Sequence, residues 1–167
     1  PVPSGTNIYY TISYDGSFVV DPVPNAAGTY MYDNTPIEIK GKTTIKAVAV
    51  NVFGIKSDIG IFEYTITPEA PRAAPSASIA GSKLPVVPVF AVKGCTMKYT
   101  INGFSNEFIC PDSIFYIDTQ TGNAYKDEEC TEILGIESGV TMTSPAIMDI
   151  RASLDGVESE PNRYIYV

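Results

Sequence analysis

The chain has 167 residues, 44% of them hydrophobic and 18% charged, with a net charge of −8 and neither histidine nor tryptophan. This length allows one domain or two small ones, each able to bury a core. The missing imidazole excludes Ser-His-Asp and Cys-His catalysis and histidine-ligated metal, and the acidic balance argues against nucleic acid, whose phosphates need clustered Lys and Arg.

Hydrophobic residues alternate with period two along most of the chain, which is typical of half-buried strands rather than helices. Val, Ile, Thr, Tyr and Phe dominate these runs, and such side chains fit a pleated surface well. Turn sequences such as Asn102-Gly103 separate the runs. The pattern predicts an all-β sandwich or barrel. The expected strands, in chain order, are 8–12, 43–50, 61–66, 86–92 and 97–101.

Motifs of the first half recur in the same order in the second half, so the chain contains a repeat. The spacing between matching motifs grows from 89 to 105 residues, which makes the middle of the second copy about 16 residues longer. A segment of weak helical character, 126–134, lies in this longer middle and is expected to form either a short helix or an excursion from the sandwich. The recurring motifs are YTI at 10–12 and 99–101, I-[KR]-A at 45–47 and 150–152, and G-x-x-S at 54–57 and 156–159.

A stretch rich in Pro and Ala joins the two copies, and its five prolines predict a stiff, extended connection. We therefore expect two domains, 1–67 and 68–167. The first has too few residues before its first strand to hold a leading strand, and the second has an inserted loop at about 105–135. The opening Pro1-Val2-Pro3 resembles a linker and predicts a piece of a longer protein. No apolar run approaches the roughly 20 residues of a membrane span, so membrane insertion is not expected.

The first copy resembles the chitobiase/β-hexosaminidase C-terminal-type repeat. The resemblance implies two tandem immunoglobulin- or fibronectin-III-like β-sandwich domains. It also implies a non-catalytic accessory module of a larger secreted or cell-surface bacterial protein, related to carbohydrate, with no catalytic residue and no cofactor. The matching motifs are IYYT at 8–11, DGS at 15–17, PIEI at 36–39, TTIKAVAV at 43–50, G-x-x-S at 54–57 and YTI at 64–66.

The three cysteines leave several pairings open. Cys110 and Cys130 bracket the longer middle of the second copy, and a disulfide between them would close a loop of about 20 residues, worth roughly 3 kcal/mol by the loop-entropy model. Cys95 directly precedes a strand, where a buried apolar role is the commoner one. The alternatives are a bond that involves Cys95, or three free thiols, because the count is odd. A catalytic thiolate is not expected, since no histidine exists to activate it.

Aromatic side chains near turns are the candidates for ligand contact, because loop aromatics are available to a ligand when exposed. Tyrosines within strands are expected to serve the core instead. Asp15, Asp21 and Asp33 could converge on a weak calcium site, although no D-x-D-x-D-G loop is present in the sequence. The candidate contact residues are Tyr14, Phe18, Tyr30, Tyr32 and Phe104.

The resulting hypothesis is a structural spacer that holds neighbouring modules of the same polypeptide at a fixed spacing. The alternative is a binding module that presents loop aromatics to a polysaccharide or an exposed edge strand to a protein. A third class is an enzyme, which without histidine would have to rely on two carboxylates that face each other across a cleft.

Overall fold

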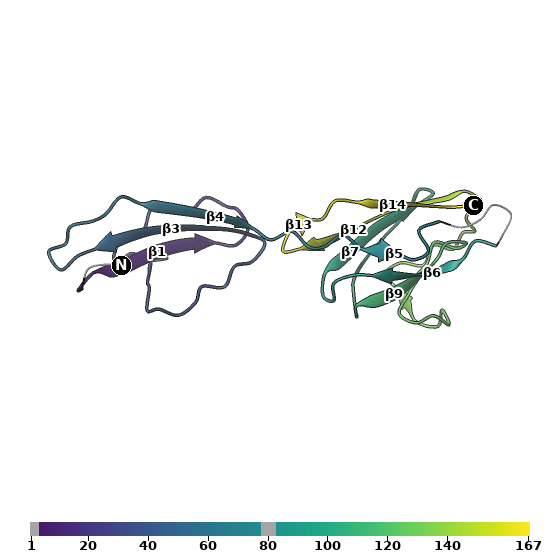
Figure 1. The fold of residues 1–167 in the computed structure, drawn as a ribbon, viewed down its shortest axis with the longest axis horizontal. Coiled ribbons are helices and arrows are strands. Elements are labelled where there is room, and N and C mark those ends of the chain that lie inside the picture. The colour runs from purple at the N-terminus through teal and green to yellow at the C-terminus, as the bar shows by residue number, and fades with distance from the viewer. Residues whose placement is uncertain (1–3, 78–82) are drawn as a thin grey trace. The chain divides into compact units, whose positions relative to one another are not determined.

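The computed structural model describes residues 4–77 and 83–167, and every regular element in this part of the chain is a strand (Figure 1). Helices that could cross a membrane do not occur among the described residues. The predicted all-β class is therefore confirmed. The chain divides into two compact units: Pro1–Ile66 with Asp155–Val157, and Thr67–Leu154 with Glu158–Val167.

The first unit contains one four-stranded sheet in the order β2-β1-β3-β4. All three neighbouring pairs are antiparallel, and the register places Tyr10 opposite Ala47 and Ile45 opposite Phe62. The predicted strands 8–12 and 43–50 are confirmed by β1 and β3, and β4 covers most of 61–66. The strands are β1 (Asn7–Ser13), β2 (Tyr30–Met31), β3 (Lys42–Val50) and β4 (Gly60–Thr65).

Segments without strand structure cover the two faces of this sheet in place of a second sheet. On one face Val19 is buried, and the Thr11 hydroxyl donates a hydrogen bond of 2.6 Å to the Val20 carbonyl. On the other face Ile37 and Ile39 lie over Ile45. Prolines interrupt both covering segments, and a proline cannot donate to a strand ladder.

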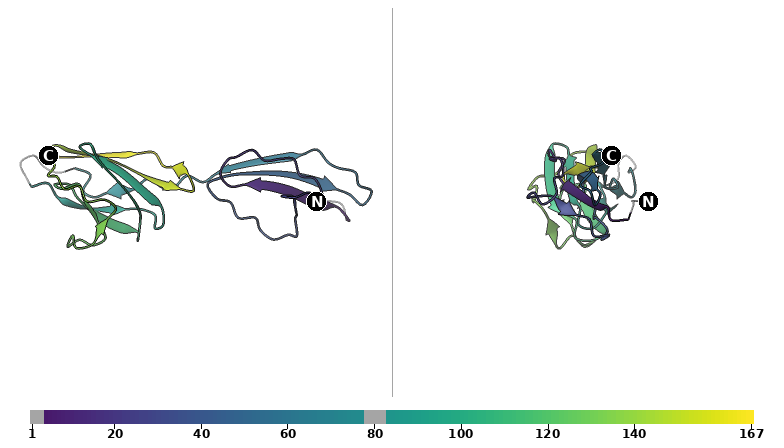
Figure 2. Two further views of the ribbon diagram at one scale, coloured as in Figure 1. Left: turned by 180° about the vertical axis from the view of Figure 1, so that it is seen from behind. Right: turned by 90° about the vertical axis from the view of Figure 1, so that its left-hand side faces the viewer.

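The second unit is a sandwich of two sheets, whose strands can be followed from both sides in Figures 1 and 2. One sheet has the order β11-β10-β9-β6-β5. The other has the order β13-β12-β7-β8, and β14 also pairs with β12. The first sheet contains β5 (Arg72–Ala73), β6 (Val86–Phe90), β9 (Ile114–Asp118), β10 (Ala124–Tyr125) and β11 (Ile133–Leu134). The second contains β7 (Thr96–Ile101), β8 (Phe104–Ile109), β12 (Ala146–Leu154), β13 (Val157–Glu158) and β14 (Asn162–Tyr166).

An apolar core fills the space between these two sheets. Alternate residues of each strand enter it, as the period of two requires: Met97 and Ile150 from one sheet and Ile117 from the other are each fully buried. Phe108 and Phe115 meet across the core edge to face, with ring centroids 5.1 Å apart, a geometry that the ring quadrupoles favour.

The stretch 105–135 corrects one expectation, because it is not a single inserted loop. It holds most of β8 together with β9, β10 and β11, since FSNEFI and IFYID alternate between buried and exposed side chains. The segment 126–134 forms turns and β11 rather than a helix; Cys130, at φ 59°, has a left-handed backbone that ends any helical run.

Ile150→Ala should destabilise the second unit by about 2 to 5 kcal/mol, because it leaves a cavity in a core that cannot collapse fully. Ile147→Ala, on the same strand but 40% exposed, is the matched control and should cost less than about 1 kcal/mol. Urea unfolding followed by circular dichroism measures both. Equal losses for the two variants would contradict the assignment of the core face.

Candidate functional site

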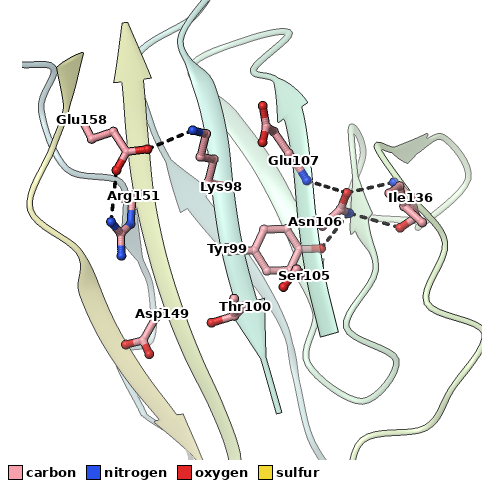
Figure 3. A pocket seen from close by; sticks show the side chains of 10 residues that line it. All are labelled: Lys98, Tyr99, Thr100, Ser105, Asn106, Glu107, Ile136, Asp149, Arg151 and Glu158. Atoms are coloured by element: carbon pink, nitrogen blue, oxygen red, sulfur yellow. Dashed lines mark hydrogen bonds and ion pairs between the residues drawn. The ribbon is translucent and has the colours of Figure 1, made fainter. Parts of the chain in front are cut away.

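A polar groove of about 450 Å³ lies on the second unit, along β7, β8 and β12 (Figure 3). Successive side chains of a strand point to opposite faces, so alternate residues of each strand turn away from the core and into this groove. Its charged and hydroxyl side chains are Lys98, Tyr99, Thr100, Ser105, Glu107, Asp149, Arg151 and Glu158.

Two cations face each other in the polar groove. The register places Arg151 directly opposite Lys98, and like charges in that position destabilise a sheet. Glu158 lies between them and accepts hydrogen bonds from Lys98 Nζ at 2.9 Å and from Arg151 Nη1 at 3.1 Å. The hydrogen bond from Lys98 is the largest cause that lowers the pKa of Glu158, and that from Arg151 lowers it further.

Asp149 is paired in a similar way at the next position along β12. Arg163 on β14 donates two parallel hydrogen bonds to it, from Nε and Nη2, each 2.7 Å long. This two-point geometry fits a guanidinium to a carboxylate, and the hydrogen bond from Arg163 lowers the pKa of Asp149. Two of the three carboxylates in the polar groove are therefore held ionised by arginine or lysine.

Asn106 ties the loop after β11 to the edge of the polar groove. Its Nδ2 donates to the carbonyls of Leu134 and Ile136, at 3.1 and 3.2 Å, and to the Tyr99 hydroxyl at 3.1 Å. Its Oδ1 accepts from the backbone N–H groups of Glu107 and Ile136. Burial raises the pKa of Tyr99, whose hydroxyl in turn donates to a backbone carbonyl at 2.6 Å. These contacts give Asn106 a structural role.

An apolar groove of about 560 Å³ lies on the first unit, on the face of the sheet beneath residues 32–40. Phe62 and Tyr64 on β4 are 47% and 45% exposed, because β4 is an edge strand and no second sheet covers it among the described residues. From the sheet come Ile8, Tyr10, Ile45, Phe62 and Tyr64, and from the covering segment come Tyr32, Ile37 and Ile39.

The five aromatic residues expected to contact a ligand do not gather in one place. Tyr32 lines the apolar groove, and Tyr30 packs against Tyr10 with ring centroids 5.5 Å apart. Tyr14 and Phe18 instead lie beneath the ammonium groups of lysines, at 5.8 and 5.1 Å from the ring centroids. Phe104, in the second unit, is half-buried and packs against the core.

The three aspartates considered for calcium each have a different partner. Asp21 forms an ion pair with Lys46 at 2.8 Å, and Asp33 accepts a hydrogen bond from the backbone of Thr35. Asp15 accepts from the Ser13 hydroxyl, the largest cause of its lowered pKa. Within residues 4–77 and 83–167, no group of three or more acidic or cysteine side chains is placed to hold a metal ion.

The predicted Cys110–Cys130 bond is not formed in the structure, where both residues carry free thiols. Cys110 is buried and its Sγ lies 2.9 Å from the Asp112 carbonyl, whereas Cys130 is half-buried in the turn between β10 and β11. Burial raises the pKa of both thiols. The pairing stays a prediction.

Sequence reasoning missed both grooves. Tyrosines within strands were expected to serve the core, whereas the structure exposes Tyr64; the run at 61–66 alternates like a half-buried strand and gives no sign that its apolar face lies on an uncovered edge strand. The polar groove could not be found from the sequence either, because it brings Lys98 together with Glu158, 60 residues further along the chain, in a register that turns and packing decide.

The family described as Fn3 associated matches residues 3–64. This match supports a fibronectin-III- or immunoglobulin-like accessory module in the first unit, and it does not extend to the narrower chitobiase-type repeat. No curated protein matches the chain.

Solved structures with some likeness include the BSP domain of a biofilm-associated protein. It is 15% identical with a TM-score of 0.37, over 96% of this chain and 25% of that one. The FN1–FN3 domains of chicken CNTN1 are 10% identical with a TM-score of 0.29, over 97% of this chain and 54% of that one. The chain thus spans a quarter of one structure and about half of the other, and the strands described above carry the fold assignment.

Asn106→Ala should destabilise the second unit by about 2 to 4 kcal/mol, because it leaves the Ile136 N–H and two carbonyls without their buried partner. Ser105→Ala, at the exposed neighbouring position, should change the stability by less than about 0.5 kcal/mol. Thermal unfolding compares the two, and amide hydrogen exchange at 134–136 should accelerate in the Asn106 variant alone. Unchanged exchange there would refute the bridging role.

Proposed function

We propose that the chain is a non-catalytic spacer within a larger secreted or cell-surface protein, and that it holds its neighbouring modules at a fixed distance. The proposal includes the domains 1–67 and 68–167, the narrower chitobiase-type assignment of the first, and its relation to carbohydrate. The observation that carries it is the shortness of the chain between the two units.

Each unit anchors its end of the connection by a hydrogen bond to a backbone group of the connection. The last anchor of the first unit is the Ile66 N–H, which donates to the Gly41 carbonyl at 2.9 Å. The first anchor of the second unit is the Pro71 carbonyl, which accepts from Asn162 Nδ2 at 2.8 Å. Four residues, 67–70, lie between the anchors, and Pro68 among them is buried. A connection of this length and composition has little freedom to act as a hinge.

Tyrosines of the last strand secure the second anchor. The Tyr164 hydroxyl accepts a hydrogen bond from the Ala73 N–H at 3.1 Å, and it lies 3.4 Å from the Pro71 carbonyl. The Tyr166 hydroxyl donates to the Pro75 carbonyl at 3.0 Å. The segment that enters the second unit is thus fixed to the strand that ends it, 91 residues later.

The carboxylates of the polar groove support a non-catalytic role. Glycoside hydrolysis needs one carboxylic acid whose pKa is raised so that it can donate a proton. Asp149 and Glu158 have the opposite property, because their cationic partners lower the pKa of each.

The spacer role predicts a narrow distance distribution between the units. Spin labels attached through a non-canonical ketone residue at Asp58 and Glu129, both exposed, avoid the native thiols. Insertion of six Gly/Ser residues between Thr67 and Pro68 should broaden the distribution by about 13 Å, the size of a six-residue flexible coil. Pulsed electron paramagnetic resonance measures the width.

The matched control is the same six-residue insertion between Ala27 and Gly28, in an exposed turn of the first unit. It should leave the width of the distance distribution unchanged. A distribution that is already about as broad in the parent chain would overturn the spacer role.

The apolar groove favours a second candidate function, binding of a polysaccharide. Concave apolar surfaces with a few hydroxyl groups at the rim suit small ligands, and a pyranose ring can stack its C–H face on an aromatic side chain. Tyr64 and Phe62 present such rings side by side on β4, where each is almost half exposed.

Phe62→Ala and Tyr64→Ala should each weaken binding of a hexasaccharide at least tenfold, which corresponds to about 1.4 kcal/mol. Phe53→Ala, at an 84% exposed aromatic outside the groove, is the control and should leave binding unchanged. Calorimetry against cello-, xylo- and chito-oligosaccharides provides the measurement. An absence of heat across the whole panel would eliminate this candidate and leave the spacer role standing.

A further inference from the structure

Cys95 and Cys110 lie directly across from each other at one end of the β7–β8 pair. The register that places Thr96 opposite Ile109 continues by one residue to these two cysteines. The Cys110 N–H donates to the Cys95 carbonyl at 2.9 Å, and the Gly94 N–H donates to the Cys110 carbonyl at 3.0 Å. Two residues on one strand thus face one on the other, and Gly94 has a φ of +84°, which together define a glycine-led β-bulge.

The two side chains share one face of the sheet. Each is 1% exposed, and each belongs to the same core as Met97 and Phe108, the inward residues two positions along their strands. Cross-strand neighbours on one face have Cβ atoms about 4.5 to 5.5 Å apart, and a disulfide needs about 3.5 to 4.5 Å. The Cys110 Sγ lies 2.9 Å from the Asp112 carbonyl, so a bond requires this side chain to turn toward Cys95 and the two strands to approach slightly, and a bulge is a place where the ladder can supply that approach.

We propose that Cys95 and Cys110 form a disulfide that closes the β7–β8 hairpin. The oxidant is a low-molecular-weight or protein disulfide. One cysteine thiolate attacks this disulfide and releases one thiol, and the second cysteine then displaces the other. The two cysteines lose two electrons and two protons, and the oxidant leaves as two thiols.

The bond forms while the chain folds, before the core closes. In the folded chain both sulfurs are buried, and burial, followed by smaller contributions that include Cys95, raises the pKa of Cys110. The thiolate, which is the attacking species, is then scarce and shielded from an oxidant. An oxidant present during folding meets two exposed thiols that the nascent hairpin brings together.

This pairing competes with Cys110–Cys130, since Cys110 can form one bond. Cys130 lies in the turn between β10 and β11, which belong to the opposite sheet, and its thiol is close to Asp118, Asp127 and Glu129. The electrostatic neighbours of Cys110 are Cys95 and Asp112. Under the proposal Cys130 keeps its thiol while the other two cysteines pair, which explains why the chain has an odd number of cysteines.

Tryptic mapping separates the pairings, because Lys93, Lys98, Lys126 and Arg151 place each cysteine in its own peptide. The full chain is refolded from the reduced, denatured state with oxidised and reduced glutathione, blocked with an alkylating agent and digested without reductant. We expect peptide 94–98 joined to 99–126, with Cys130 alkylated in 127–151. A link between 99–126 and 127–151, or three alkylated thiols, overturns the proposal.

Variants give an independent readout that does not depend on the map. Reduction should lower the Tm of the parent chain and of Cys130→Ser by about 5 °C or more, as expected for a short closed loop. Cys95→Ala and Cys110→Ala should unfold at the same temperature with and without reductant. A reductant effect that disappears in Cys130→Ser instead would assign the bond to Cys130.

Discussion

The hydrogen bonds between the β14 tyrosines and the segment at 71–75 are the constraint on which the second unit depends. They join the first residues of the unit to its last strand, so the sandwich is closed by contacts between its two chain ends. Tyrosine suits this task because its ring packs in the core while its hydroxyl reaches a backbone group. The same contacts fix where the connection from the first unit ends, and therefore how short that connection is.

The two units solve the problem of burying a sheet in different ways. In the second unit each sheet covers the other, so its aromatic residues meet in the core, as Phe108 and Phe115 do. In the first unit irregular segments cover a single sheet among the described residues, and they cover it incompletely. The apolar groove follows directly from this, since aromatic residues that a second sheet would bury remain half exposed on β4.

Local patterns predicted the strands well because alternation of side chains is a property of each strand by itself. The strands 8–12, 43–50 and 97–101 were recovered from composition and period alone. In the stretch 105–135, which was misjudged as a loop, β10 and β11 have only two residues each and alternation over two residues carries no signal, whereas the alternation in β8 and β9 was overlooked. Partners on neighbouring strands, such as Glu158 and the two cations Lys98 and Arg151 that it binds, depend on the register of the strands, which only the folded chain fixes.

The charges of the polar groove show why an acidic surface need not be a reactive one. On a sheet, residues from three strands form a ladder in which each charge has neighbours at about 5 Å on both sides. Here Arg151 on β12 and Lys98 on β7 are direct neighbours, Glu158 on β13 forms ion pairs with both of them, and Arg163 neutralises Asp149. Asp149 and Glu158 are thereby kept in their charged form, because their cationic partners lower the pKa of each. Such a surface contributes specificity of register and solubility to the sheet, which are the properties that a spacer between modules requires.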